Sequence, residues 1–171
     1  FLPIIKKVRI KFPSLWLSIN FLAETGKVAF PILSDLSSQG CFIDGYWGDD
    51  ACIDENGVNI EAKIISKIRN DTGWKGLYFG GTAFKKQRII PQEKYGDAAK
   101  FATQFMDVVT TSGIATGIEA DISKIKTFRS SIGDSVLAIA SGITVDNAKT
   151  YSIADCFMVA TGINYENDFC K

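Results

Sequence analysis

Short runs rich in β-branched and aromatic residues alternate along this chain with stretches whose apolar residues recur at helical spacing. Each run ends in Gly, Ser, Thr, Asn or Asp or is directly followed by one of them, and a polar loop leads to the next stretch. The runs are predicted to be strands, at residues 15–20, 41–44, 76–80, 107–111, 136–140 and 156–160. The stretches are predicted to be helices, at 28–37, 60–69, 95–105, 122–131 and from Val145 onward, with 1–11 as the tail of another. In the helix at 60–69, Ile60, Ile64, Ile65 and Ile68 share one predicted apolar face.

Several predicted strands are apolar on both faces, which is typical of parallel strands covered by helices. The repeated strand and helix units indicate an α/β fold. A closed (β/α)8 barrel needs eight strands in about 250 residues, and we count six in 171 residues. We therefore expect a single barrel domain over residues 1–171 that covers about six units, strands 3 to 8, and lacks the first strands and the last helix.

A doubly wound open sheet is the alternative fold, because such a sheet can be complete with six strands. The positions of the glycine-rich turns favour the barrel. An open nucleotide-binding sheet carries its glycine fingerprint after the first strand. Here the Gly, Ser and Thr turns follow the last three strands, as in phosphate-binding barrels.

Composition and charge exclude several classes of function. The 19 basic and 19 acidic residues balance, so no overall field favours nucleic acid, and no basic stripe with interleaved aromatic residues is present. No apolar run approaches the roughly 20 residues of a transmembrane helix. The chain contains no His, and its four Cys form no Cys-x-x-Cys pair, which excludes the usual structural zinc sites, His-based metal sites and a histidine base, and we assign no metal-binding residue. We expect a cytoplasmic protein that could form a homo-oligomer. The sequence indicates no particular cofactor.

The turns after the last three predicted strands are candidates for an anion site. Glycine lets a ligand approach the backbone, and successive N–H groups and hydroxyls bind anions. Thr144 is predicted to cap the following helix, which would place Ser141 and Gly142 before a positive helix end. The predicted phosphate-binding residues in these turns are Thr111, Gly113, Thr116, Gly117, Ser141, Gly142, Thr161 and Gly162, and Asn20 joins them from the end of the first strand.

Catalytic candidates follow the second and third predicted strands. Asp44 could act as a general base, or it could only cap a loop. Lys85 or Lys86 could pair with a substrate anion or form a Schiff base, or the two could belong to a solvated face. Asp49 and Asp50 are a weak signal for Mg²⁺, and Trp47 could stack on a ring or form a wall of the site.

The segments DVVTTSGIATG, LAIASGITVDNAKTY and ADCFMVATGI, within residues 107–163, resemble the end of phosphate-binding barrels of the ribulose-phosphate-binding type. More narrowly, they resemble the BtpA family, named for a photosystem I biogenesis factor. Ala140 stands where that family commonly has Gly, and the segment after Phe84 also departs from the family pattern. The resemblance implies a barrel with an unassigned ligand or reaction.

Three functions remain open from the sequence. The first is binding or conversion of a small phosphorylated metabolite, such as a sugar or nucleoside phosphate. The second is a non-catalytic assembly or stability factor that retains an anion pocket. The third is aldolase chemistry through Lys85 or Lys86. Whether the protein is an enzyme is therefore not determined at this point.

Overall fold

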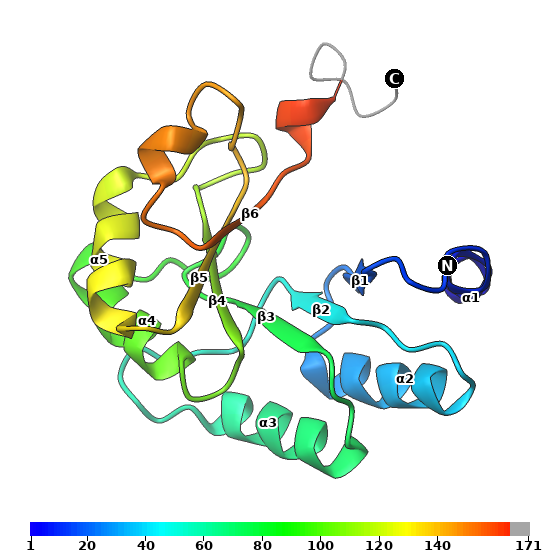
Figure 1. The fold of residues 1–171 in the computed structure, drawn as a ribbon. Coiled ribbons are helices and arrows are strands. Elements are labelled where there is room, and N and C mark those ends of the chain that lie inside the picture. The colour runs from blue at the N-terminus through cyan, green and yellow to red at the C-terminus, as the bar shows by residue number, and fades with distance from the viewer. Residues whose placement is uncertain (165–171) are drawn as a thin grey trace.

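The computed structural model describes residues 1–164, apart from the side chain of Thr161. Six parallel strands form one curled sheet in which each strand pairs with the next in sequence order (Figure 1). The strands are β1 (Ser18–Ile19), β2 (Gly45–Gly48), β3 (Leu77–Gly81), β4 (Val108–Ser112), β5 (Val136–Ala140) and β6 (Cys156–Met158). This sequential parallel order is that of a (β/α)8 barrel, of which the strands form a part.

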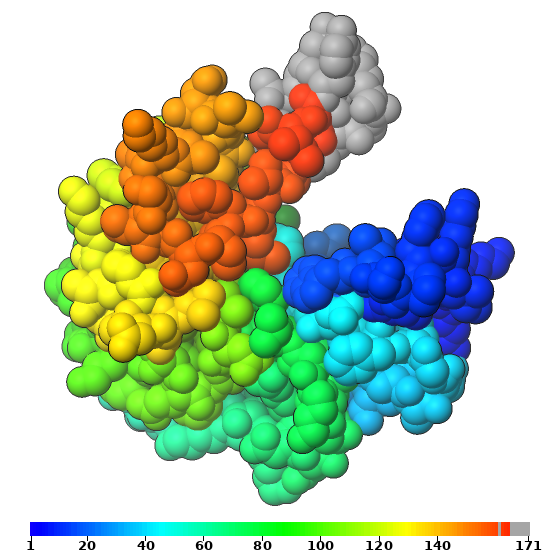
Figure 2. Space-filling model, viewed as in Figure 1, coloured from blue at the N-terminus to red at the C-terminus, as the bar shows by residue number. Residues whose placement is uncertain are grey.

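Helices α2 to α5 lie on the outer side of the curled sheet (Figure 1). The helices are α1 (Leu2–Lys11), α2 (Gly26–Ser38), α3 (Ile60–Thr72), α4 (Tyr95–Ala102) and α5 (Ile122–Ile132), with short 3₁₀ turns η1 (Gln92–Lys94), η2 (Ala148–Tyr151) and η3 (Thr161–Ile163). The sheet does not close on itself within these residues, and Figure 2 shows an open side between the first and last parts of the described chain. None of the helices within residues 1–164 is long and apolar enough to cross a membrane.

Two differences from the sequence prediction affect the site. The second strand was predicted at 41–44 and occurs at Gly45–Gly48. Glycine at both ends of this strand concealed it, and a Cβ on Gly45 would lie 2.9 Å from the Trp16 ring. The helix predicted from Val145 was also wrong, because only the four-residue turn η2 follows β5.

Alternation along the strands separates the outer core from the inner face. Tyr46 of β2 and Tyr78 of β3 are paired in register, fully buried and stacked with ring centroids 5.5 Å apart. Phe30 of α2 packs edge-on against both rings. The next residue along β2, Trp47, therefore faces the interior of the curled sheet. In α3 the buried residues are Ala62 and Ile65, so the predicted apolar face was wrong at Ile60 and Ile64, which are exposed.

Three pairs of one arginine and one aspartate lie at the amino ends of the strands, and we call each pair an Arg–Asp clamp. In every clamp the arginine lies in the last turn of the helix before an odd-numbered strand, and the aspartate directly precedes the next strand. The nitrogen-to-oxygen distances are 2.5 to 2.9 Å, and the clamps are Arg9–Asp44, Arg69–Asp107 and Arg129–Asp155.

The clamps tie the strands together in pairs. In the middle clamp, Asp107 accepts the backbone N–H of Tyr78 at 2.7 Å, and Arg69 also donates to the Gly76 carbonyl at 2.8 Å. The other two aspartates accept a backbone N–H in the same way, from Leu17 and Leu137. Each clamp thus satisfies backbone groups at the start of one strand, links them to the aspartate before the next strand and fixes a helix end beside them.

Replacing Arg69 with Met should lower the free energy of unfolding by about 1–3 kcal/mol, because the Asp107 carboxylate and the Gly76 carbonyl lose a donor. Urea unfolding measures this change. The control is Lys67→Met in the same helix, which removes the exposed pair with Asp71 and should change stability by less than about 0.5 kcal/mol. Equal losses in the two variants would contradict a structural role for the clamp.

Candidate functional site

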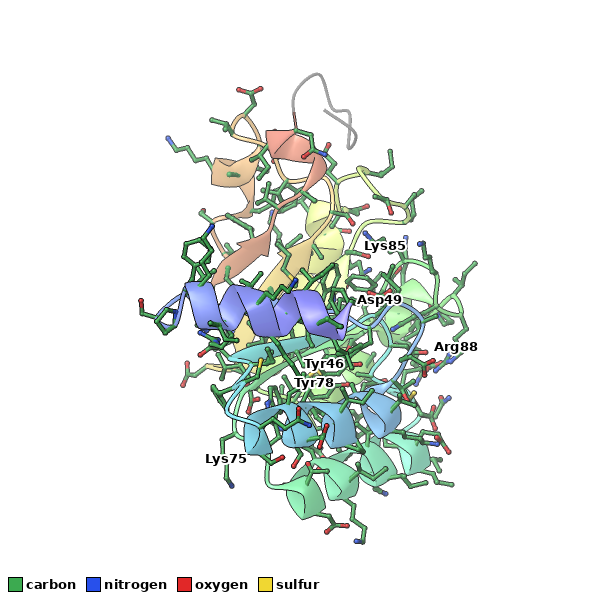
Figure 3. The ribbon with its side chains drawn as sticks, turned by 90° about the vertical axis from the view of Figure 1, so that its right-hand side faces the viewer. Tyr46, Asp49, Lys75, Tyr78, Lys85 and Arg88 are labelled. Atoms are coloured by element: carbon green, nitrogen blue, oxygen red, sulfur yellow. The ribbon has the colours of Figure 1, made fainter. Side chains whose placement is uncertain are left out.

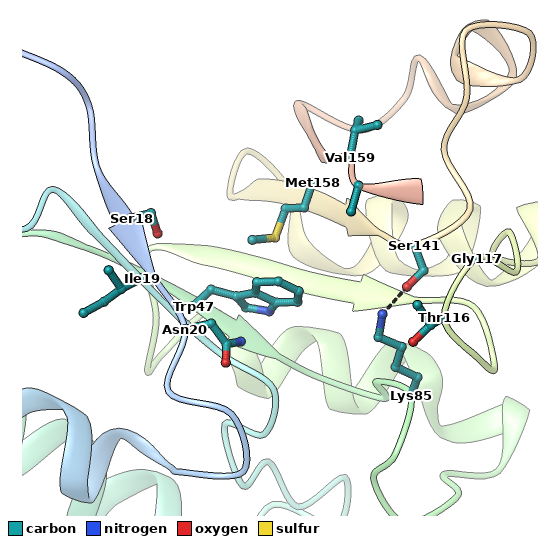
Figure 4. A pocket seen from close by; sticks show the side chains of 11 residues that line it. Ser18, Ile19, Asn20, Trp47, Lys85, Thr116, Gly117, Ser141, Met158 and Val159 are labelled. Atoms are coloured by element: carbon teal, nitrogen blue, oxygen red, sulfur yellow. Dashed lines mark hydrogen bonds between the residues drawn. The ribbon is translucent and has the colours of Figure 1, made fainter. Parts of the chain in front are cut away.

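A cavity of about 350 Å³ opens among the carboxyl ends of the strands and the inner face of the sheet (Figure 4). Its walls come from six separate regions of the sequence, because all strands of a parallel sheet end at one edge. The lining includes five residues that the sequence indicated as site residues, namely Asn20, Lys85, Thr116, Gly117 and Ser141. Trp47, Met158 and Ala160 are further parts of the wall. The cavity size is that of a site for a small metabolite.

Lys85 and Ser141 meet in this cavity. The Lys85 Nζ atom lies 2.5 Å from the Ser141 Oγ atom (Figure 4). The backbone N–H of Lys85 donates to the Ser112 hydroxyl at 2.8 Å, which fixes the start of the lysine side chain. Burial lowers the pKa of Lys85, and Lys86 lowers it further, whereas the Asp49 carboxylate acts in the opposite direction. The site therefore presents one partly desolvated amine next to a hydroxyl.

Asp49 directly follows β2 and lies at the same end of the sheet as Lys85, opposite to Lys75, which precedes β3 (Figure 3). The Asn20 amide donates to Asp49 Oδ1 at 2.9 Å. The buried Oδ1 atom of Asn20 and the buried Nε1 atom of Trp47 have no hydrogen-bond partner among residues 1–164. Trp74 and Tyr78 of the outer core also carry buried polar atoms without partners, so such atoms do not by themselves mark the site.

The prediction of Asp44 as a general base rested on a strand that ends at this residue, and that premise was wrong. Asp44 precedes β2, so it lies at the amino end of the sheet. Its carboxylate is held by Arg9 and by the Leu17 N–H in a clamp. Because the strand is Gly45–Gly48, Asp49 and not Asp44 lies at the carboxyl end. Sequence propensity does not favour a strand bounded by two glycines, so the sequence pattern did not reveal it.

The predicted turn glycines lie next to one another, but they contact neighbouring loops. A Cβ on Gly113 or on Gly142 would meet the backbone of residues 118–119 within 2.4 Å, and one on Gly162 would meet the Ile143 carbonyl at 2.1 Å. These glycines allow close packing of the loops at the carboxyl ends. The η2 turn is too short to supply the positive helix end expected beside Ser141.

Two predicted threonines do not contribute a described side chain to the cavity. Thr111 is fully buried, and its hydroxyl donates to the Ala83 carbonyl at 3.4 Å. The side chain of Thr161 lies outside the described part of the chain. Within residues 1–164, no group of three or more acidic, Cys or His side chains is placed to hold a metal ion.

Lys124 is a buried residue that sequence reasoning missed. Its Nζ atom donates to the Ala83 carbonyl at 2.6 Å and to the Ser112 carbonyl at 2.8 Å, and it lies 5.1 Å from the Tyr95 ring centroid. Lys124 thus joins the loop that carries Lys85 to the end of β4. The one signal in the sequence was a lysine in the first turn of a helix, where the helix dipole disfavours a cation.

Burial lowers the pKa of Lys124 from 10.5 to about 8. Between these values the unfolded chain binds more protons than the folded chain, so Lys124 makes stability rise with pH in this window. As the pH increases through this window, we expect the free energy of unfolding of the wild type to rise relative to that of Lys124→Met. The limiting slope of this difference is about 1.4 kcal/mol per pH unit. Urea unfolding from pH 7 to 10.5 measures the difference.

The exposed Lys126 on the same helix is the matched control for this titration. The free energy of unfolding of Lys126→Met, plotted against pH, should run parallel to that of the wild type over the whole range, because this side chain is exposed. A Lys124→Met curve that also ran parallel to the wild type would show that burial does not lower the pKa of Lys124.

No protein-family model matches the sequence, and no curated protein matches it. Among solved structures, the chain is similar to the carboxyl transferase domain from Rhizobium etli pyruvate carboxylase with 3-bromopyruvate, with a TM-score of 0.55 and 11% identity. The match covers 90% of this chain and 28% of that chain. A likeness at this identity concerns the fold alone, and it supports a TIM barrel without supporting the BtpA family in particular. The chain therefore has a TIM-barrel-like α/β fold with a cavity at the carboxyl ends of its strands.

Proposed function

We propose that the cavity at the carboxyl ends binds or converts a small phosphorylated metabolite, such as a sugar or nucleoside phosphate. The observation that carries this proposal is the contact between Lys85 and Ser141 in the cavity wall. A lysine ammonium and a hydroxyl are donors that suit a phosphate oxygen. Thr116 and Gly117 line the same side of the cavity and add a hydroxyl and a backbone N–H.

The remaining wall suits the uncharged part of such a metabolite. Trp47 presents an aromatic ring to the cavity, between the Asn20 region and the Lys85–Ser141 pair (Figure 4). Asn20 lines the cavity and offers an amide group that can hydrogen-bond to a sugar hydroxyl. We also propose that the chain belongs to the BtpA family. We further propose that the protein is cytoplasmic, where the thiols of Cys41, Cys52 and Cys156 stay reduced.

Calorimetric titration with ribose 5-phosphate at pH 7 and low salt tests the proposal. Lys85→Met should weaken binding by about 10- to 100-fold, since it removes a charged hydrogen bond. Ser141→Asp should abolish binding, because it adds a carboxylate beside the phosphate. Lys86→Met is the control: Lys86 is exposed and does not line this cavity, so affinity should change by less than about fivefold.

Equal affinities of the wild type, Lys85→Met and Ser141→Asp would contradict the proposal. Binding of ribose 5-phosphate without any conversion, followed by NMR, would favour the non-catalytic alternative with a retained anion pocket.

A further inference from the structure

Ser141 holds an unusual backbone conformation. It is the first residue after β5, and its φ angle is 79°, in the left-handed region. This region is uncommon for a residue with a Cβ, and such residues concentrate at sites where the surrounding structure fixes them for function. Gly142, at φ 69°, continues the same sharp turn. The turn directs the Ser141 hydroxyl into the cavity (Figure 4).

A base lies within reach of this hydroxyl. A serine hydroxyl is a weak nucleophile until a neighbouring group accepts its proton, and a lysine amine can serve as that group. The Lys85 Nζ atom is 2.5 Å from the Ser141 Oγ atom. Burial and the neighbouring Lys86 lower the pKa of Lys85, which increases the fraction of neutral amine, and Asp49 opposes this change.

Lys85 is itself oriented by its surroundings. Its backbone N–H donates to the Ser112 hydroxyl, and Lys124 donates to the Ala83 and Ser112 carbonyls on either side of this bond. A nucleophile, a base in contact with it and a third group that orients the base form the usual constellation of nucleophilic catalysis.

The same cavity holds donors for a developing negative charge. Addition of a nucleophile to an acyl carbon creates an oxyanion, which N–H and O–H donors stabilise. Gly117 and Thr116 line the cavity on the side of Ser141. Trp47 also lines it, and its buried Nε1–H group has no partner among the described residues.

We infer that Ser141 and Lys85 form a nucleophile–base dyad that accepts acyl groups from small esters. The Ser141 oxygen bonds to the acyl carbon while its proton moves to the neutral Lys85 amine. The ester C–O bond then breaks, and the leaving alkoxide takes that proton from Lys85. Water attacks the acyl-serine, giving its proton to Lys85, and the carboxylic acid leaves as Ser141 regains a proton. This activity goes beyond phosphate binding and does not depend on it.

Reaction of the protein with p-nitrophenyl acetate tests the inference. Release of p-nitrophenolate gives the rate, and mass spectrometry of peptides locates the acetyl group. We expect the acetyl group on Ser141, and we expect Lys85→Met to slow its formation at least about 100-fold, as loss of a general base does. Lys75→Met, at an exposed position on the opposite end of the sheet (Figure 3), should stay within about twofold of the wild type.

Ser141→Gly removes the nucleophile and retains a residue that adopts the left-handed backbone without strain. Its circular dichroism should match that of the wild type, and its p-nitrophenolate release should fall to the level of Lys85→Met or below. Acetyl groups only on surface lysines, or equal release by the wild type and Ser141→Gly, would overturn the inference. The ribose 5-phosphate titration is independent of this outcome, so a failed dyad and a failed phosphate site can be told apart.

Discussion

The parallel hydrogen-bonded ladder from β1 to β6 is the constraint on which the site depends. Each strand pairs with the next in sequence order, so every strand begins at one edge of the sheet and ends at the other. The loops after β1, β3, β4 and β5 therefore meet, although Asn20 and Ser141 are far apart in the chain. The contact between Lys85 and Ser141 follows from this arrangement, because β3 and β5 both flank β4.

The two ends of the sheet use charge differently. At the amino ends, the arginines and aspartates of the clamps neutralise one another and satisfy backbone groups. At the carboxyl ends, Lys85 forms no ion pair within the described chain, and Asp49 is bound by the Asn20 amide. The clamps stabilise the sheet, and the carboxyl ends retain an amine at the cavity, the end of the sheet where (β/α)8 barrels usually carry their sites.

The sequence predicted the fold better than it predicted the site. Apolar strands such as Val136–Ala140 and the glycine-rich late turns indicated a parallel barrel correctly, since burial of both strand faces leaves a clear pattern. Asp44 was misplaced because Gly45 and Gly48 conceal the strand between them. Gly142 packs against another loop, and Lys124 is buried. Both features depend on contacts between distant segments, which cannot be predicted from local sequence patterns.

A crystal structure of the protein soaked with inorganic phosphate tests the central claim most directly. The account predicts an anion in the cavity, within hydrogen-bond distance of Lys85 Nζ and Ser141 Oγ, with Ser141 still in the left-handed conformation. A Lys85 side chain turned to bulk solvent, away from Ser141 and from any bound anion, would contradict it.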